Sequence, residues 1–440
     1  MADIKDAKIT AAEYSGTKKP LPKADKYIWA IYIALLVISV IELYSASSRE
    51  VTATNVFGPI IRHGQMLFAG VIITVLLSRM HYGWLRPLTP IFVTLTILLG
   101  LYVLFKGDII NGARRSTTIL GIAIQPAELL KLSVVLVIAL VMSRPNPDNT
   151  TKNGAIVWSA AIVLVCGGLL FSQGLTNTLL LMGISFAMML IAGVEWKKFL
   201  CVLLAYGILG AGAYKIRDHS KPHYSAEEWT HITETGQDYS GKTVTIDRSN
   251  TQQSRIDRWL GNDSVPKYAE EITSLNRQEQ YSFMAQANGG IIGNLPGNSR
   301  ETSRLPLAFS DYIYAIVVED WGLIGGLVLL ALYLWLLARA GAIASRCSRA
   351  FPALLVMGMA VLIVLQALFH MAIVTGVFPV SGQPLPLISK GGSSILATSI
   401  AFGIMLGVSR YAVQNNKKRD IDAELLSLPT DVTAENPSKI

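Results

Sequence analysis

The segment Leu305–Gly326 reads LPLAFSDYIYAIVVEDWGLIGG and places Asp311, Glu319 and Asp320 at the start of a long apolar run. A carboxylate in or beside hydrocarbon is costly, so an ionisable residue there indicates a functional site. Ser310 is a candidate cap, which would leave Asp311 at the positive end of a helix dipole, where its ionised form is favoured. We therefore expect a base at Asp311, although Ser-Asp is equally typical of a plain helix start.

The other two acidic residues differ in their angular position on the expected helix. At about 100° per residue, Glu319 lies roughly 80° around the axis from Asp311, and Asp320 lies on the opposite side. Only Glu319 is therefore expected to share a cavity with Asp311 and to help bind a substrate.

Composition indicates a polytopic membrane protein. The chain is 51% hydrophobic and 15% charged, whereas soluble domains have about 25% charged residues. The net charge of +8 comes from basic residues between apolar runs, as cytoplasmic loops require, so we expect no nucleic-acid binding. Cys166, Cys201 and Cys347 lack CxxC spacing and are expected to be inert thiols.

The fold class expected is all-α, with about ten transmembrane helices. Apolar runs of spanning length occur at 27–46, 65–82, 87–105, 126–143, 155–172, 176–194, 199–215, 312–338, 352–376 and 391–411. The first run follows a polar head without a small-residue cleavage site, so it is read as an uncleaved span. Basic residues concentrate in alternate short loops, which predicts that both termini are cytoplasmic.

The predicted organisation has five parts: a cytoplasmic tail (1–26), helices one to seven (27–215), a large extracytoplasmic loop (216–306), helices eight to ten (307–411) and a cytoplasmic tail (412–440). The long loop contains an amphipathic segment, 269–287, suited to the membrane surface. His219, His223 and His231 precede it, but Pro222 is unsuited to a helix, and no metal site is predicted there.

The loop between the third and fourth spans contains a second candidate site, NGARRSTTILGIAIQPAELLKL, from Asn111 to Leu132. Arg114 and Arg115 suit phosphate oxygens on a substrate, and ordinary interfacial anchoring is the alternative. Glu128 and Lys131 are three positions apart on one helix face, where they could pair with each other or with a ligand. A purely structural pair remains the alternative for these two residues.

A third segment, PVSGQPLPLISKGGSS, runs from Pro379 to Ser394 on the expected outer side. Irregular backbone at membrane depth is tolerated only where it is buried in protein or lines a wet cavity. The segment is therefore predicted to form one wall of a site, with Ser393 and Ser394 as candidate substrate-binding hydroxyls.

Together these motifs resemble the SEDS family of bacterial cell-wall growth and division, which includes FtsW and RodA, over most of the chain. The matching signatures follow the family order: YSAS at Tyr44–Ser47, GARR at Gly112–Arg115, QPAELLKL at Gln125–Leu132, RIDRW at Arg255–Trp259, GGIIG at Gly289–Gly293, SDYIYAIVVEDWG at Ser310–Gly322 and PLPLISKGGSS at Pro384–Ser394. Gly297-Asn298-Ser299 looks like the FtsW division branch.

Several positions depart from the family pattern. Ser116 stands where Trp is frequent, Lys390 where Tyr is usual, His370 where Asn is common, and Asp320 where a second Glu is common. An acidic residue expected near SQGLTNT is absent as well. The Ser at position 116 removes any stacking role expected there.

The resemblance implies a peptidoglycan glycosyltransferase that polymerises lipid II outside the cytoplasmic (inner) membrane, at the division septum. Asp311 would be the base in an inverting transfer from an undecaprenyl-pyrophosphate-linked donor. Arg114 or Arg115, with Lys131, would steady the pyrophosphate, and a divalent cation, Mg²⁺ or Mn²⁺, could assist. The implied partners are a class B penicillin-binding transpeptidase and other division-complex proteins.

Two alternatives belong to other functional classes. The buried Glu128–Lys131 pair would also suit a lipid II flippase, and the long outer loop would suit a non-catalytic scaffold for the transpeptidase. In the scaffold hypothesis Asp311 is dispensable, whereas in the flippase hypothesis transport depends on the pair.

Overall fold

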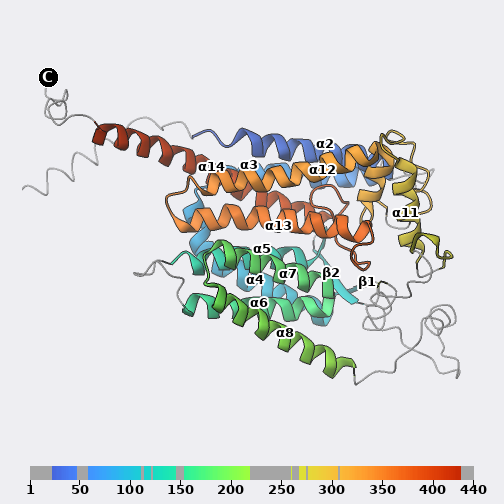
Figure 1. Cartoon of the computed structure of the whole chain (residues 1–440), viewed down its shortest axis with the longest axis horizontal. Coiled ribbons are helices and arrows are strands. Elements are labelled where there is room, and N and C mark those ends of the chain that lie inside the picture. The colour runs from blue at the N-terminus through green and yellow to red at the C-terminus, as the bar shows by residue number, and fades with distance from the viewer. Residues whose placement is uncertain are drawn as a thin grey trace, which may run out of the picture.

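The computed structural model describes residues 22–46, 58–110, 113–119, 122–144, 153–218, 259, 267–273, 276–305 and 308–427. These residues form a bundle of long helices with a small sheet and a short helix at one end (Figure 1). The helices are α2 (Lys26–Ala46), α3 (Gly58–Arg79), α4 (Leu85–Lys106), α5 (Pro126–Met142), α6 (Asn153–Gln173), α7 (Leu175–Ile191), α8 (Trp196–Asp218), α11 (Arg277–Gly289), α12 (Ile313–Ala344), α13 (Ala350–Val374) and α14 (Gly392–Ser427), with short 3-10 turns η1 (Tyr82–Trp84) and η2 (Lys267–Ala269).

Every predicted apolar span coincides with one of the long helices. Among the described residues, seven helical segments are long and apolar enough to cross a membrane: Lys26–Ala46, Ile61–Arg79, Tyr82–Lys106, Asn153–Phe171, Ile313–Ala344, Ala350–Val374 and Gly392–Ala412. The class of polytopic helical membrane protein is thus confirmed. The full number of spans stays a prediction.

A small antiparallel sheet occupies the region that the sequence analysis treated as a loop. Its strands are β1 (Asp108–Ile110), β2 (Ala113–Ile119) and β3 (Ile122–Ile124), in the order β1-β2-β3. The run STTILGIAI is rich in Thr and Ile, which favour strands, so a signal for this sheet was present. The arginine pair therefore lies on a strand of this sheet.

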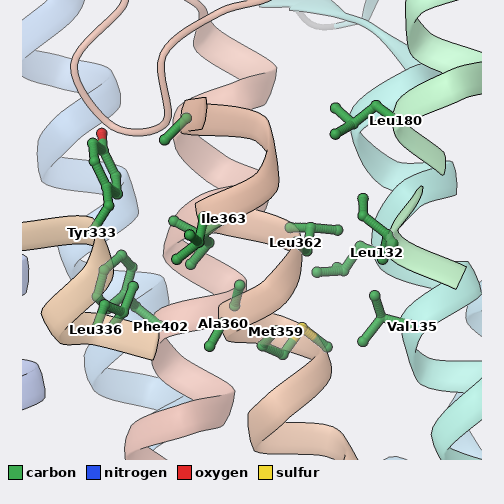
Figure 2. Close-up of a cluster of buried hydrophobic side chains, with 14 of the residues drawn as sticks. Leu132, Val135, Leu180, Tyr333, Leu336, Met359, Ala360, Leu362, Ile363 and Phe402 are labelled. Atoms are coloured by element: carbon green, nitrogen blue, oxygen red, sulfur yellow. The ribbon is translucent and has the colours of Figure 1, made fainter. Parts of the chain in front are cut away.

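Helix α13 is the centre of the bundle. It contacts α5, α7, α12 and α14, and its span is buried along most of its length. Figure 2 shows Leu362 directed toward Leu132 of α5, while Ile363 lies on the side of Tyr333 and Leu336 of α12. A helix surrounded by other helices must be apolar all round, so each polar residue on α13 requires a specific partner.

At the end of the bundle that the charge pattern predicts to be cytoplasmic, called the inner end below, charged groups tie the helices together. Nε of Arg339 donates to Oδ2 of Asp25 at 2.9 Å, and Arg410 donates to the carbonyls of Pro22 and Ser78. Burial alone would raise the pKa of the Asp25 carboxyl, but hydrogen bonds from Arg339 and from backbone N–H groups outweigh it and lower that pKa.

The opposite end carries the sheet and α11, and is called the outer end below because the charge pattern predicts that it faces outward (Figure 1). Helix α11 docks on the outer parts of α12 and α13, where Ser282 and Gln286 both donate to the carbonyl of Val374. The predicted amphipathic segment is thus packed against the bundle. Its place along a membrane surface stays a prediction.

A break in α12 at Gly322, with φ 69°, allows the chain after α11 to pair with the helix backbone. The N–H groups of Asn294 and Leu295 donate to the carbonyls of Glu319 and Asp320 at 3.0 and 2.8 Å. A Cβ atom on Gly322 would lie 2.2 Å from the carbonyl oxygen of Ile291. The glycines of this region are therefore required by the close approach of two backbones.

Candidate active site at the outer end

Asp311 lies in a turn directly before α12. The helix begins at Ile313, its N-cap is Tyr312, and no side chain caps it. The expectation that Ser310 caps the helix is therefore wrong, because its hydroxyl donates instead to Oδ1 of Asp311 at 2.9 Å. The Asp311 side chain is partly exposed, so it combines a fixed position with access from outside the protein.

The loop between α13 and α14 lies against this turn. A Cβ atom on Gly382 would lie 2.8 Å from Oδ2 of Asp311. The N–H of Lys390 donates to the carbonyl of Phe309 at 2.9 Å, and the hydroxyl of Ser389 donates to the carbonyl of Ser310 at 2.7 Å. The loop 379–391 therefore forms one wall beside Asp311, and one main-chain and one side-chain hydrogen bond join it to the residues just before Asp311.

Polar side chains from the surrounding helices hold the carbonyls of this loop. His370 contacts the carbonyl of Gln383 at 2.6 Å, Gln366 donates to that of Pro384 at 3.3 Å, and Tyr333 donates to that of Pro386 at 2.7 Å. The side-chain amide of Gln383 in turn donates to Oδ1 of Asn177 at 2.9 Å. Three carbonyls of the irregular backbone are thus paired with side chains of the surrounding helices, as its place in the bundle requires.

The sequence analysis did not identify these supporting residues as part of the site. A signal was available for His370 and Gln366, since polar residues inside an apolar span require partners. The sequence could not predict the partners themselves, because Gln383 and Pro384 come close to His370 and Gln366 only when the chain folds back after α13.

Glu128 and Lys131 form the predicted pair. Nζ of Lys131 lies 2.8 Å from Oε1 of Glu128, and both side chains are almost completely buried. Gln366 of α13 closes the set: it accepts from Lys131 at 2.9 Å and donates to Glu128 at 3.3 Å. Since Gln366 also donates to Pro384, the ion pair is connected to the wall beside Asp311.

Glu319 lies in a different set of contacts. Its Oε1 accepts from the N–H groups of Arg300 and Glu301 at 2.9 and 3.3 Å, and its Oε2 accepts from the hydroxyl of Ser299. The side chain is completely buried. The structure therefore uses Glu319 to hold the turn at Ser299–Glu301, and its expected role in substrate binding stays a prediction.

The remaining candidate residues lie around the same end of the bundle. Arg115 is half-buried on β2, which contacts α4, α5 and α6, while β3 contacts α14. Arg114 is on the same strand, and its side chain lies outside the described part of the structure. Ser393 and Ser394 are buried in the first turn of α14. Substrate-binding roles for these four residues stay predictions.

Within the described residues, no group of three or more His, Cys, Asp and Glu side chains gathers as a metal site would require. The histidines at 219, 223 and 231 lie outside those residues. Mg²⁺ is commonly held by one or two carboxylates plus substrate phosphates. A divalent cation at Asp311 would therefore depend on oxygens of a bound pyrophosphate, and this too stays a prediction.

The fold and the site define a polytopic helical membrane protein with a fixed carboxylate at one end of its bundle. Residues 25–414 match the FtsW/RodA/SpoVE family, described as cell cycle proteins. The chain belongs to this family, as its sequence motifs indicated.

The chain matches curated relatives over nearly their full length. The chain is 27% identical over 393 residues to the probable peptidoglycan glycosyltransferase FtsW of Halomonas elongata, covering 87% of this chain and 90% of the relative. It is 28% identical over 409 residues to stage V sporulation protein E of Bacillus subtilis, covering 90% and 99%. It is 26% identical over 396 residues to the peptidoglycan glycosyltransferase MrdB of Escherichia coli, covering 88% and 94%.

Solved structures share the fold. A chain from a structure described as "Structural coordination of polymerization and crosslinking by a peptidoglycan synthase complex" superposes with a TM-score of 0.65 at 23% identity, covering 89% of this chain and 99% of that one. The rod shape determining protein RodA of Thermus thermophilus superposes with a TM-score of 0.57 at 22% identity, covering 88% of this chain and 97% of that one.

Proposed function

We propose that this protein is a peptidoglycan glycosyltransferase that polymerises lipid II at the outer face of the cytoplasmic membrane. The observation that carries the proposal is the placement of Asp311: a partly exposed carboxylate, fixed by Ser310 and by the loop at Gly382, at the end opposite the basic inner loops. The names of the FtsW and MrdB relatives support the same activity.

In the proposed reaction Asp311 accepts the proton of the 4-hydroxyl on the acceptor's N-acetylglucosamine. That oxygen attacks the anomeric carbon of the donor with inversion, and the bond to the lipid pyrophosphate breaks as the pyrophosphate leaves. General-base assistance of this kind is worth about 10²–10⁴ in rate. A base must be within hydrogen-bond reach of its proton, which a partly exposed side chain allows.

The basic residues divide into two proposed roles. Arg115, half-buried on β2, is proposed with Arg114 to steady the negative charge of the leaving pyrophosphate. Lys131 is completely buried, and Glu128 and Gln366 both hold its ammonium group. We therefore assign Lys131 to support of the loop beside Asp311, because direct contact with a substrate would require breaking that set.

The finer assignment is to septal cell-wall synthesis in cell division. It rests on Gly297-Asn298-Ser299, which looks like the division branch, although relatives from the sporulation and MrdB types match comparably well. The likeness to a chain of a complex named for polymerisation and crosslinking supports a class B transpeptidase as partner. Localisation of a fluorescent fusion to the septum or to the lateral wall distinguishes the two cellular roles.

The decisive experiment is polymerisation of labelled lipid II by the purified protein together with its transpeptidase. We expect glycan strands from the wild type and almost none from Asp311→Asn, which cannot accept the proton. Glu195→Gln is the matched control, since it neutralises an exposed acid that pairs with Lys198 on the inner side. Near-normal polymerisation by a folded Asp311→Asn protein would transfer the assignment to the scaffold, or to a flippase if lipid II transport depends on Glu128 and Lys131.

A further inference from the structure

The imidazole of His370 points at the loop beside Asp311 in one defined tautomer. Its Nδ1 lies 2.6 Å from the carbonyl oxygen of Gln383, and the side chain is 1% exposed. A carbonyl oxygen can only accept, so Nδ1 carries the proton and Nε2 is left as an acceptor. Nε2 is buried and has no hydrogen-bond partner among the described residues. Among the described residues, the His370 side chain therefore makes its hydrogen bond to the carbonyl of Gln383.

The carbonyl held by His370 belongs to the residue next to Gly382. Gly382 packs on the Asp311 carboxylate so closely that a Cβ atom there would meet Oδ2 at 2.8 Å. On the other side of Gln383, the carbonyl of Pro384 is held by Gln366. A shift of the Gln383 peptide must therefore be passed to Gly382, and from there to the carboxylate.

We propose that His370 is a positioning residue for Asp311. The hydrogen bond from Nδ1 to Gln383 sets the place of Gly382, and Gly382 in turn limits the directions available to the carboxylate. This inference rests on the proposed function, since it assigns His370 a part in the reaction of that base without contact to the substrate. A misplacement of about 1 Å can cost 10²-fold in rate, so a loss of this one bond is measurable.

Three substitutions at position 370 separate the two ring nitrogens. In His370→Asn the side-chain amide nitrogen occupies nearly the place of Nδ1 and can donate to Gln383. In His370→Gln the amide reaches the place of Nε2 and misses Gln383, and in His370→Leu neither nitrogen is replaced. We expect Asn to keep kcat within about threefold, and Gln and Leu to lower kcat about 10- to 100-fold with KM for lipid II within about twofold.

Tyr206→Phe is the matched control. It also removes a hydrogen bond from a side chain to a main-chain carbonyl, here the partly buried bond to Ala160, but between α8 and α6, away from the loop. We expect it to lower thermal stability without lowering kcat. Thermal unfolding is measured for all variants, so that a general loss of stability is separated from a loss of rate.

The outcomes are distinct. Normal kcat in His370→Leu and His370→Gln would overturn the positioning role, as would equal losses in all three variants, which would indicate a structural role alone. If His370→Leu does not fold, the comparison of Asn with Gln decides. No polymerisation by the wild type with its transpeptidase would instead overturn the proposed function. Full activity of Asp311→Asn would do the same, whatever happens at position 370.

Discussion

Gly382 packs against the carboxylate of Asp311, so that a single added methyl group at position 382 would lie 2.8 Å from Oδ2. The contact joins the start of α12 to the loop between α13 and α14. Because the neighbouring atom is the end of a flexible side chain, the protein can relieve the crowding by turning the carboxylate. An added methyl group at position 382 should therefore displace the carboxylate of the proposed base, and should leave the fold intact.

Gly382→Ala is therefore expected to lower kcat for lipid II polymerisation by about 10- to 100-fold, with a thermal unfolding temperature close to that of the wild type. The control is Gly341→Ala in α12, where the added methyl group would meet only Met357 at 4.0 Å. That variant should polymerise normally. A fully active Gly382→Ala protein would show that the contact does not orient Asp311.

The Glu128–Lys131 pair predicts a strongly non-additive double-mutant cycle. Either residue changed to Ala leaves a lone charge among buried side chains, which costs about 3–5 kcal/mol in folding stability. The double change removes both charges, so its cost should be well below the sum. Unfolding and polymerisation are measured for the four proteins, and strictly additive losses would refute the pair.

The Asp25–Arg339 contact predicts a pH-dependent contribution to stability. The folded protein holds the pKa of Asp25 below its ordinary value of 3.8, so the contribution is complete above that value and is lost as pH falls through the folded pKa. Asp25→Asn should lower the free energy of unfolding by about 1.5–3 kcal/mol at pH 7.

The check is thermal unfolding of wild type and Asp25→Asn from pH 7 downward. The difference between them should stay constant to about pH 5 and shrink below the ordinary carboxyl pKa. A difference that grows on acidification would contradict the assignment. Glu195→Gln, which removes an exposed acid, should show little difference at any pH.

Gly322→Ala is expected to disrupt the outer end of the bundle. Position 322 has φ 69°, and the added methyl group would lie 2.2 Å from the carbonyl oxygen of Ile291, which belongs to a backbone that cannot move aside cheaply. The pairing of Asn294 and Leu295 with α12 should weaken, and protease cleavage near residues 290–300 should increase. Unchanged cleavage and stability would show that the two backbones separate without cost.

Much of this protein follows from its sequence alone. The apolar runs predicted the long helices, because burial in hydrocarbon or in a helical core requires nothing more than local hydropathy. The motifs in family order predicted membership of the FtsW/RodA/SpoVE family, and Asp311 stood out because a carboxylate at the start of an apolar span needs a reason. The spacing of Glu128 and Lys131 predicted their pairing, since residues three apart share a helix face.

Only the tertiary structure decided how those parts are joined. The hydroxyl of Ser310 turned to Asp311 and not to the helix end, and Glu319 paired with the turn at Ser299–Glu301. Gln366 reaches Lys131 across 235 positions of sequence, and His370 reaches Gln383 after the chain reverses. Hydropathy and helical period act over a few residues, whereas these partners are chosen by which helices pack together, and α13 had to be placed at the centre before its polar side chains could meet the loop.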